Sequence, residues 1–461
     1  MVDWEGPLSE AYDRALTYLK SFPERRVGPR ATAEELHQAL GGPLPTGPTD
    51  PREVVEHLAK GVDDGLLPSG SGRFFGFVFG GATPASLAAD WLTTVWDQNA
   101  GLYAASPAAA VVEDITARWL VELFGLPATT SVGFVTGAQM ANFTALAAAR
   151  HEVLRRAGWD AERQGLSGSP KIRVLAGAER HDTIDRALRF LGLGTDCIEP
   201  IPVDDQGRMR ADALAEALGS KDSPTIVCAQ AGNVNTGAFD PIAEICGIAH
   251  AHRTWVHVDG AFGLWAAVSP GLRQLVAGVD QADSWATDAH KWLNVPYDSG
   301  IVLCAHPEPH RAAMSIRAAY LIQDENGERD SLDYNPEFSR RARGIPVYAA
   351  LRALGRDGVS EIVDRCHAMA QRFADRLRAG DVQVLNDVVL NQVLVRFGDD
   401  DALTRRVVTE VQNEGTCWMS GTTWQGKAAM RISVSNWTTG PGDIDRSAAA
   451  VLKVFQRLSI S

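Results

Sequence analysis

Two stretches of the sequence decide the fold: TWVHVDGAFG at residues 254–263 and DSWATDAHKWLNVPYDSG at residues 283–300. Each begins with a short run of bulky residues that is typical of a buried strand, and then passes into a turn. Further candidate strands are SVGFVT (131–136), KIRVLAGA (171–178), TIVCAQA (225–231) and GIVLCAH (300–306), and stretches with apolar residues at helical spacing lie between them (141–158, 181–194, 211–219 and 241–252). This alternation predicts βα units that build a mainly parallel sheet, so the expected fold class is α/β.

The segments that flank this region have a different pattern. From about residue 338, a long helical region leads to strand-like VVLNQVLVRFG, a helix near residues 401–415 and strand-like AAMRISVSNW. The first eighty residues contain helices and a Pro/Gly-rich stretch without an obvious core. We therefore expect an N-terminal helical segment that packs on a partner subunit (1–80), a large domain (81–345) and a small C-terminal α+β domain (346–461).

Composition excludes several classes of function. The 461 residues carry a formal net charge of −13, so no basic surface is expected that could neutralise a nucleic-acid backbone or an anionic membrane. The first residues lack the basic and apolar regions of a secretory signal, and no stretch approaches ~20 apolar residues. Six cysteines are scattered without CxxC spacing, which suits neither a zinc site nor a disulfide framework. We expect a cytoplasmic protein without a bound metal.

Lys291 is the first candidate for chemistry, because it lies among apolar and aromatic neighbours just after a predicted strand. Buried lysines are rare, and their lowered pKa allows the neutral amine to form a Schiff base. Asp259 ends the strand TWVHVD and is followed by the small residues Gly260 and Ala261, which would let a planar ligand approach. A carboxylate there can hold a pyridine nitrogen protonated, although a lone aspartate at a strand end also caps turns.

Two further strand ends carry candidate ligand groups. The stretch GFVTGAQMANF turns at Gly137 from a strand directly into a helix, whose first N–H groups, with Thr136 and Gln139, can bind a phosphate. His181 follows another predicted strand and could lie flat on a pyridine ring; a histidine in that place also serves as a helix cap. The four strand-end positions in this order are much more specific than any one of them.

Together these residues resemble the pyridoxal-phosphate-dependent group II decarboxylases, the family that acts on aromatic amino acids, glutamate, histidine and cysteine sulfinate. The resemblance runs from about Arg73 to Asp445 and includes GRFFGFVFGGATPASLAADWL, NTGAFDPI, HVDGAFG, DAHKW and RISVSNWTTGPGDID. It implies fold type I of the pyridoxal-phosphate enzymes, similar to aspartate aminotransferase, with a mainly parallel seven-stranded sheet. It also implies pyridoxal 5'-phosphate as the cofactor and a homodimer with shared active sites.

The resemblance assigns roles to matching positions. Lys291 would carry the cofactor, Asp259 would bind the pyridine nitrogen and His181 would stack on the ring. The phosphate turn would be Gly137, Ala138 and Gln139, with Ala261 under the ring and His290 and Asn233 also in contact; family members often have threonine at the position of Asn233. Arg431 would bind the substrate α-carboxylate, since a guanidinium can bind a carboxylate through two hydrogen bonds.

A polar segment between the two domains, about residues 321–337, is expected to be a lid that covers the partner subunit's site. The resemblance suggests that Tyr334 is the tyrosine that protonates the substrate Cα, although its spacing to Arg340 is shorter than in the aromatic-amino-acid branch. Phe77 and Tyr103 are expected at the substrate side chain. An apolar wall there favours an aromatic or bulky apolar side chain over a second carboxylate.

The expected reaction is therefore decarboxylation of a free L-amino acid to the amine and CO2. An aldehyde-forming decarboxylase, a C–C lyase and an aminotransferase are alternatives on the same scaffold. A cofactor-binding protein without turnover is disfavoured, because mere binding does not require the electron sink that Lys291, Asp259 and His181 would create.

Overall fold

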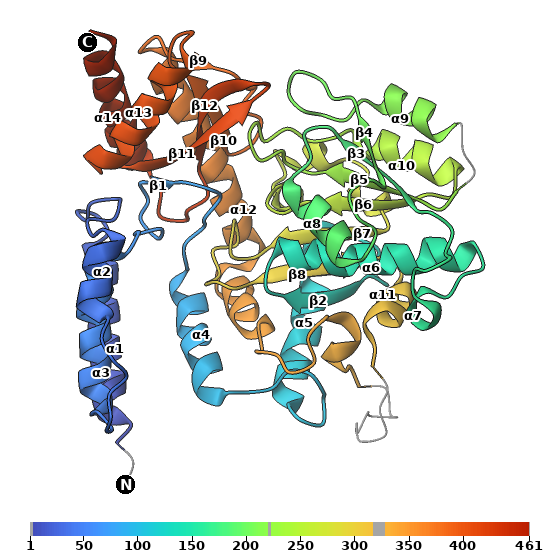
Figure 1. Cartoon of the computed structure of the whole chain (residues 1–461), viewed down its shortest axis with the longest axis horizontal. Helices are drawn as coiled ribbons and strands as arrows, with labels where there is room; N and C mark the ends of the chain where they lie inside the picture. The colour runs from blue at the N-terminus through green and yellow to red at the C-terminus, as the bar shows by residue number, and fades with distance from the viewer. Residues whose placement is uncertain (1–2, 220–222, 317–327, 461) are drawn as a thin grey trace.

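The computed structural model describes residues 3–219, 223–316 and 328–460. Two sheets of different size lie at the two ends of a long helix, with three N-terminal helices beside them (Figure 1). Among the described residues, no helix is both long and apolar enough to cross a bilayer.

The larger sheet has seven strands in the order β2-β8-β7-β6-β5-β3-β4. Its strands are β2 (Ser131–Val135), β3 (Arg173–Gly177), β4 (Ile198–Ile201), β5 (Thr225–Gln230), β6 (Trp255–Asp259), β7 (Ser284–Asp288) and β8 (Gly300–Cys304). The pairings β2–β8 and β7–β8 are antiparallel, and the other four are parallel. This confirms the predicted α/β fold with a mainly parallel seven-stranded sheet.

Helices cover both faces of the larger sheet, because its strands are buried on both sides. They are α5 (Pro107–Phe124), α6 (Ala138–Arg156), α7 (Ala161–Gln164), α8 (Asp182–Phe190), α9 (Ala211–Leu218), α10 (Ile242–Ala251) and α11 (Pro307–Met314). Successive residues of β3 show the two layers: Val174 and Ala176 pack with α6 and α8, whereas Leu175 packs with the core that contains α5 and α10. Because β4, β3, β5, β6 and β7 run parallel to one another, their carboxyl ends all lie at one edge of the sheet.

The smaller sheet has the order β1-β11-β12-β10-β9. Its strands are β1 (Phe74–Phe75), β9 (Gln383–Val384), β10 (Gln392–Arg396), β11 (Trp418–Trp424) and β12 (Lys427–Ser433), and α13 (Asp401–Glu414) and α14 (Pro441–Ser459) pack on it. The helix α12 (Gly344–Arg378) connects the two sheets, with a non-helical residue at Gly355. Strand β1 comes from the first eighty residues and pairs in parallel with β11, so this segment contributes to the small sheet.

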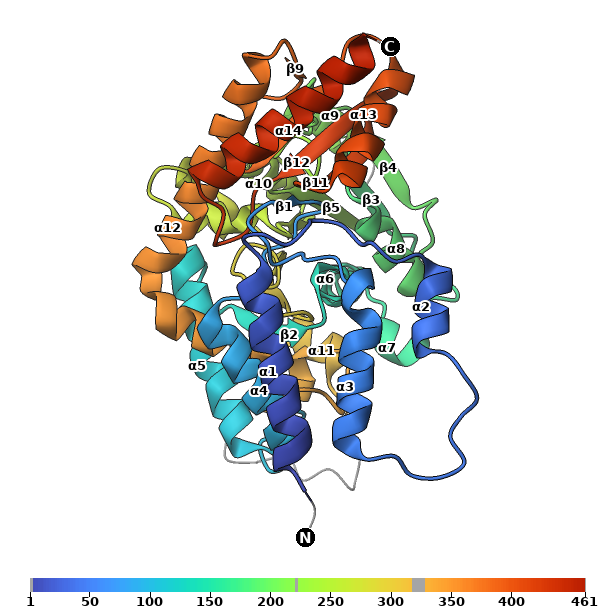
Figure 2. The ribbon, with the colours of Figure 1, turned by 90° about the vertical axis from the view of Figure 1, so that its left-hand side faces the viewer.

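The N-terminal helices α1 (Glu5–Ser21), α2 (Ala33–Leu40) and α3 (Pro51–Val62) contain no buried residue. They stand apart from the large domain, and α1 lies beside α3 (Figures 1 and 2). The Tyr12 ring of α1 meets the Trp91 ring of α4 (Pro84–Trp96) edge-on at 6.4 Å between centroids. Large apolar side chains are exposed on α1, α3 and α4 and at the N-cap of α1: Trp4, Leu8, Tyr12, Val54, Leu58, Trp91, Leu92, Val95 and Trp96. These helices therefore have an apolar surface but no core of their own.

Candidate functional site

Four of the predicted site residues lie at the edge where the parallel strands of the large sheet end. Lys291 is in the loop after β7, Asp259 is the last residue of β6, His181 lies between β3 and α8, and Gly137 lies between β2 and α6. Ligands of open α/β sheets bind at this edge, because the strand ends and the helix N-termini meet there. The topology thus brings together four residues that are spread over more than 150 positions of sequence.

The Lys291 amine is held by a carboxylate that also contacts the predicted phosphate turn. Its Nζ lies 2.9 Å from Oδ2 of Asp288, and the Ala138 N–H donates to Oδ1 of Asp288 at 2.6 Å. Asp288 is buried, with 2% of its surface exposed. A Cβ added to Gly137 would lie 3.1 Å from Cε1 of His290, so the close approach of this loop favours glycine there. Asp288 therefore fixes the position of the Lys291 amine relative to the turn at Gly137 and Ala138.

Asp259 is buried and held by two N–H donors. Oδ1 accepts a hydrogen bond from the Ala261 N–H at 3.2 Å, and Oδ2 accepts one from the Asn142 side chain, also at 3.2 Å. Asn142 lies on α6, which begins at the phosphate turn. The helix that would bind the phosphate therefore also orients the carboxylate that would bind the ring nitrogen.

His181 is the N-cap of α8 and remains exposed in this structure. Its Nδ1 accepts from the Thr183 N–H at 3.3 Å and lies 2.9 Å from the Thr183 hydroxyl, so Nε2 carries the proton in the neutral ring. Desolvation lowers its pKa, and the charges that act on it include those of Asp259, Lys291 and Arg431. The open, neutral imidazole suits stacking on a planar ring.

Arg431 approaches the same site from the small sheet. It lies on β12, between Ser420 of β11 and Leu394 of β10. Its Nε is buried without a partner, and desolvation lowers the pKa of the guanidinium to about 10. Within the part of the chain that the structure describes, no carboxylate pairs with it. Such an uncompensated, partly buried cation fits the predicted role of binding a substrate carboxylate.

A row of aromatic rings connects the small sheet to the Lys291 loop. Phe77 stacks on Trp418 at 5.6 Å and on Phe79 at 5.1 Å between ring centroids, and Phe79 meets Tyr297 edge-on at 5.3 Å. Tyr297 in turn stacks on His290 at 4.2 Å, next to Lys291. Phe77 and Tyr297 are 47% and 53% exposed, so the row offers accessible aromatic surface beside the lysine.

Two other predicted residues have identifiable contacts within the chain. The Gln139 side chain donates to the carbonyl of Thr183. The buried Asn233 donates to Glu179 O and accepts from the N–H groups of Asn235 and Thr236, so its side chain closes a turn. These bonds engage Asn233 with the protein itself rather than leaving it open toward the site.

The two predicted tyrosines lie elsewhere in the chain. The Tyr103 N–H donates to Asp330, and Tyr334 is in the short helix η5 (Ser331–Tyr334), where its ring faces His310 and the Arg329 guanidinium. Among the described residues, no hydrogen bond or ring contact joins either tyrosine to Lys291. Residues 321–327 of the predicted lid lie outside the described residues.

Sequence reasoning missed several residues of this site. Asp288 sits within the recognised DAHKW motif, but a carboxylate three residues before a lysine has no distinctive pattern. Asn142, Thr183 and His257 were overlooked because they reach the site only through other side chains. Tyr297 follows Lys291 closely, and its aromatic character was the one available signal.

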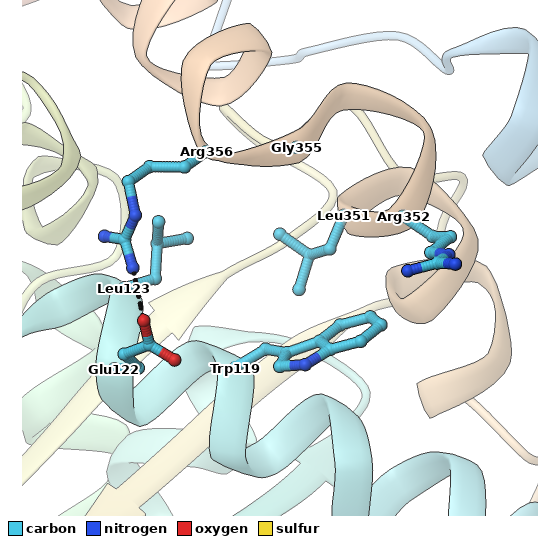
Figure 3. Close-up of a pocket in the computed structure, with 7 residues that line it drawn as sticks. All are labelled: Trp119, Glu122, Leu123, Leu351, Arg352, Gly355 and Arg356. Atoms are coloured by element: carbon cyan, nitrogen blue, oxygen red, sulfur yellow. Dashed lines mark hydrogen bonds and ion pairs between the residues drawn. The ribbon is translucent and has the colours of Figure 1, made fainter.

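A cavity of about 310 Å³ lies apart from this site (Figure 3). It is between α5 and the break in α12 and is lined by Trp119, Glu122, Leu123, Leu351, Arg352, Gly355 and Arg356. Arg356 donates to Glu122 at 2.8 Å within it. None of its residues belongs to the motifs above. Among the described residues there is also no group of three or more His, Cys, Asp or Glu side chains that could hold a metal.

The arrangement fits a planar pyridine aldehyde that carries a phosphate. Lys291 offers an amine for the aldehyde, Asp259 a carboxylate for the ring nitrogen, and the α6 N-terminus N–H groups for the phosphate. The unpartnered Nε of Arg431 remains for a second anionic group in the same site. Each functional group of such a cofactor thus has a matching group in the protein.

Comparisons with known proteins agree with this assignment. Residues 34–397 match the family described as "Pyridoxal-dependent decarboxylase conserved domain". The chain is 25% identical over 470 residues to an aromatic-L-amino-acid decarboxylase of Bacillus atrophaeus, covering 98% of this chain and 95% of the relative.

Two solved structures share the fold. The TDC of Oryza sativa, solved with PLP and tryptamine, has a TM-score of 0.91 at 23% identity, covering 98% of this chain and 97% of that chain. A 4-hydroxyphenylacetaldehyde synthase of Rhodiola rosea has a TM-score of 0.88 at 22% identity, covering 99% of both chains.

Proposed function

The chain belongs to the pyridoxal-dependent decarboxylase family, and from this premise we propose that it converts a free L-amino acid with an aromatic or bulky apolar side chain to the amine and CO2. It is an enzyme of the amino-acid decarboxylase family, and pyridoxal 5'-phosphate is its cofactor. The observation that carries the proposal is the meeting of Lys291, Asp259 and His181 at one sheet edge with the unpartnered Arg431 facing them.

The proposed cofactor contacts follow from the geometry of the large sheet. Lys291 holds the aldehyde carbon, Asp259 the ring nitrogen, His181 one ring face and Ala261 the other. The first N–H groups of α6, from Gly137 to Gln139, hold the phosphate, and His290 supports that turn. When bound, the cofactor supplies a sink for the electron pair that remains when the bond from Cα to the carboxylate breaks.

The small sheet provides the proposed substrate contacts. Arg431 would bind the α-carboxylate and so orient the substrate in the site. The exposed rings of Phe77 and Tyr297 contact the substrate side chain. A second carboxylate on the substrate would be desolvated against this aromatic row, which favours aromatic or apolar side chains.

The proposed proton donor to Cα is Tyr334, which acts in the partner subunit's site, and Tyr103 reaches the same site from its loop. In one chain, Tyr334 is held by His310 and Arg329 rather than near Lys291, which supports an action in trans. If the proton is delivered elsewhere, the aldehyde-forming, C–C lyase and aminotransferase reactions are the alternatives. The aldehyde-forming reaction is the second candidate, because a named aldehyde synthase shares the fold.

We also propose a homodimer in the cytoplasm. The helices α1 and α3 expose Trp4, Leu8 and Leu58 without burying any residue, so a second copy of the chain is the natural cover for this apolar surface. The six cysteines are free, and five of them are buried, which suits a reducing compartment.

The decisive experiment is a product analysis of the purified, cofactor-loaded protein with each of the twenty amino acids. CO2, amine, aldehyde and peroxide are measured together, and borohydride followed by peptide mapping locates the cofactor. Equal amounts of CO2 and amine from an aromatic or bulky apolar substrate are expected, with the adduct on Lys291. Aldehyde with peroxide, or keto acid without CO2, would assign one of the alternatives. An adduct on another lysine would refute the site.

A further inference from the structure

The side-chain amide of Asn142 joins three polar groups behind the proposed cofactor site. Its Nδ2 donates to Oδ2 of Asp259 at 3.2 Å and to the Thr183 hydroxyl at 3.2 Å, and its Oδ1 lies 2.9 Å from Nε2 of His257. Asn142 and His257 are fully buried. An amide has two N–H donors and one carbonyl acceptor, so the Asn142 amide forms a hydrogen bond with each of these groups.

The direction of these hydrogen bonds is fixed. Asp259 is a carboxylate that only accepts, so the NH2 group of Asn142 must face it and the amide oxygen must face His257. Nε2 of His257 therefore carries the proton, and Nδ1 accepts from the Ser284 hydroxyl at 3.0 Å. The Trp255 indole N–H donates to the same hydroxyl at 2.9 Å. Every hydrogen bond in the series from Trp255 through Ser284, His257 and Asn142 thus points toward Asp259.

The groups behind Asp259 are all uncharged. Burial lowers the pKa of His257 to about 4, so its ring is neutral at neutral pH. Had a protonated histidine contacted Asp259 directly, it would have compensated the carboxylate charge. Here an amide lies between them, and an amide orients a carboxylate without readily giving it a proton. The negative charge of Asp259 is therefore left for a cation on the site side.

The second N–H of Asn142 extends the same support to His181. The Thr183 hydroxyl accepts from Asn142 and donates to Nδ1 of His181 at 2.9 Å. One amide on α6 thus fixes both the carboxylate for the ring nitrogen and the imidazole for the ring face.

We propose that Asn142 and His257 are positioning residues that hold the Asp259 carboxylate aimed at the cofactor, so that the pyridine nitrogen stays protonated. This inference rests on the proposed function and names the residues that maintain its electron sink. Neither residue touches the cofactor; both act through Asp259. Losing a hydrogen bond to a charged group has a net effect that corresponds to a roughly 10- to 100-fold change in an equilibrium constant.

The test is the protonation of the ring nitrogen in the loaded protein without substrate. The 15N chemical shift of 15N-labelled pyridoxal phosphate is followed against pH in the wild type, Asn142→Leu, His257→Phe and His257→Gln. The inference predicts a protonation constant about 10- to 100-fold lower in Asn142→Leu and a smaller fall in His257→Phe. In His257→Gln, whose amide can still donate to Asn142, the constant should return toward the wild-type value.

A matched pair of variants separates this role from general loss of structure. Trp255→Phe and Trp285→Phe each remove a buried indole N–H from the same sheet, but Trp285 donates to the carbonyl of Val279, outside the series. Thermal unfolding of the cofactor-free proteins monitors the structural effect of both. Trp255→Phe should shift the 15N titration in the direction of His257→Phe, whereas Trp285→Phe should leave it unchanged.

Two results would overturn the inference: an unchanged titration in Asn142→Leu, or equal shifts in Trp255→Phe and Trp285→Phe. Failure of the cofactor site, on which the proposed function depends, has a different signature. In that case the wild-type protein itself would not take up the labelled cofactor on Lys291.

Discussion

Replacing Arg431 by methionine should weaken substrate binding and at the same time stabilise the fold. Desolvation lowers the pKa of this guanidinium from 12.5 to about 10. At 1.36 kcal/mol per pKa unit, keeping the charge in the folded state costs about 3 kcal/mol. The guanidinium is charged at neutral pH in both the folded and the unfolded chain, and no described carboxylate compensates it in the fold. Methionine keeps most of the apolar stem and removes that cost.

A substrate carboxylate would recover this energy when it binds. The variant should therefore raise KM roughly 100-fold, which corresponds to about 3 kcal/mol. Urea unfolding of the cofactor-free protein should show an increase of up to about 3 kcal/mol in the free energy of unfolding. The weaker substrate binding and the higher stability of Arg431→Met should thus both result from removing the same desolvated charge.

Arg396 provides the matched control on the neighbouring strand β10. It is buried, and unlike Arg431 it pairs with Asp401 and donates to the carbonyls of Gly398, Asp399 and Ala428. Arg396→Met should therefore destabilise the protein by about 3–5 kcal/mol, because it leaves buried acceptors without a donor. If Arg431→Met destabilises the fold to the same degree, or leaves KM unchanged, Arg431 is a structural arginine and the carboxylate binds elsewhere.

Three further outcomes are expected. Tyr334→Phe should slow the protonation step by about 10²–10⁴-fold and shift the product ratio from amine toward aldehyde or aminated cofactor; an unchanged ratio would assign the proton to another donor. Burial lowers the pKa of His257 to about 4 and that of His310 to about 3, so the unfolded chain takes up protons below about pH 6.5 while the folded chain does not. The free energy of unfolding should therefore fall between about pH 6.5 and 4, and His257→Gln should make that fall shallower by about 1.4 kcal/mol per pH unit in urea titrations. Asp288→Asn should raise the affinity for pyridoxal phosphate about tenfold in equilibrium dialysis, because it removes a negative charge from the phosphate turn; a weaker affinity would show that the pair of Asp288 with Lys291 matters more.

The large sheet could be predicted because most of its strands are short runs of bulky apolar residues, a pattern that is typical of buried strands. Six candidate strands from 131–136 to 300–306 correspond to β2, β3, β5, β6, β7 and β8. Strand β4 was missed because it lies at the sheet edge and contains Glu199 and Pro200, which are unfavourable in a central strand. Strand β11 was missed because its residues, WMSGTTW, are small and polar in the middle.

The site could be predicted only where a residue belongs to a motif. Asp259, Lys291 and His181 are brought together by the parallel topology itself, since each follows a strand of the same sheet. Asn142 and His257 require knowledge of which side chains face each other across α6 and β6, and no spacing in the sequence encodes that contact. The contacts of Tyr334 and Tyr103 with a partner subunit would depend on an interface that a single chain does not define.

The candidate site is divided between the two sheets, and the loop that carries Lys291 also links these sheets. The proposed cofactor groups belong to the large sheet, whereas Arg431 and Phe77 belong to the small one. Asn294, three residues after Lys291, joins them: its side chain donates to the Ser435 carbonyl and accepts from the Trp437 N–H, both just after β12. The carbonyl of Asn294 also accepts from the Thr83 N–H at the start of α4. The loop that carries the lysine therefore fixes the position of the proposed cofactor site relative to the small sheet that carries Arg431.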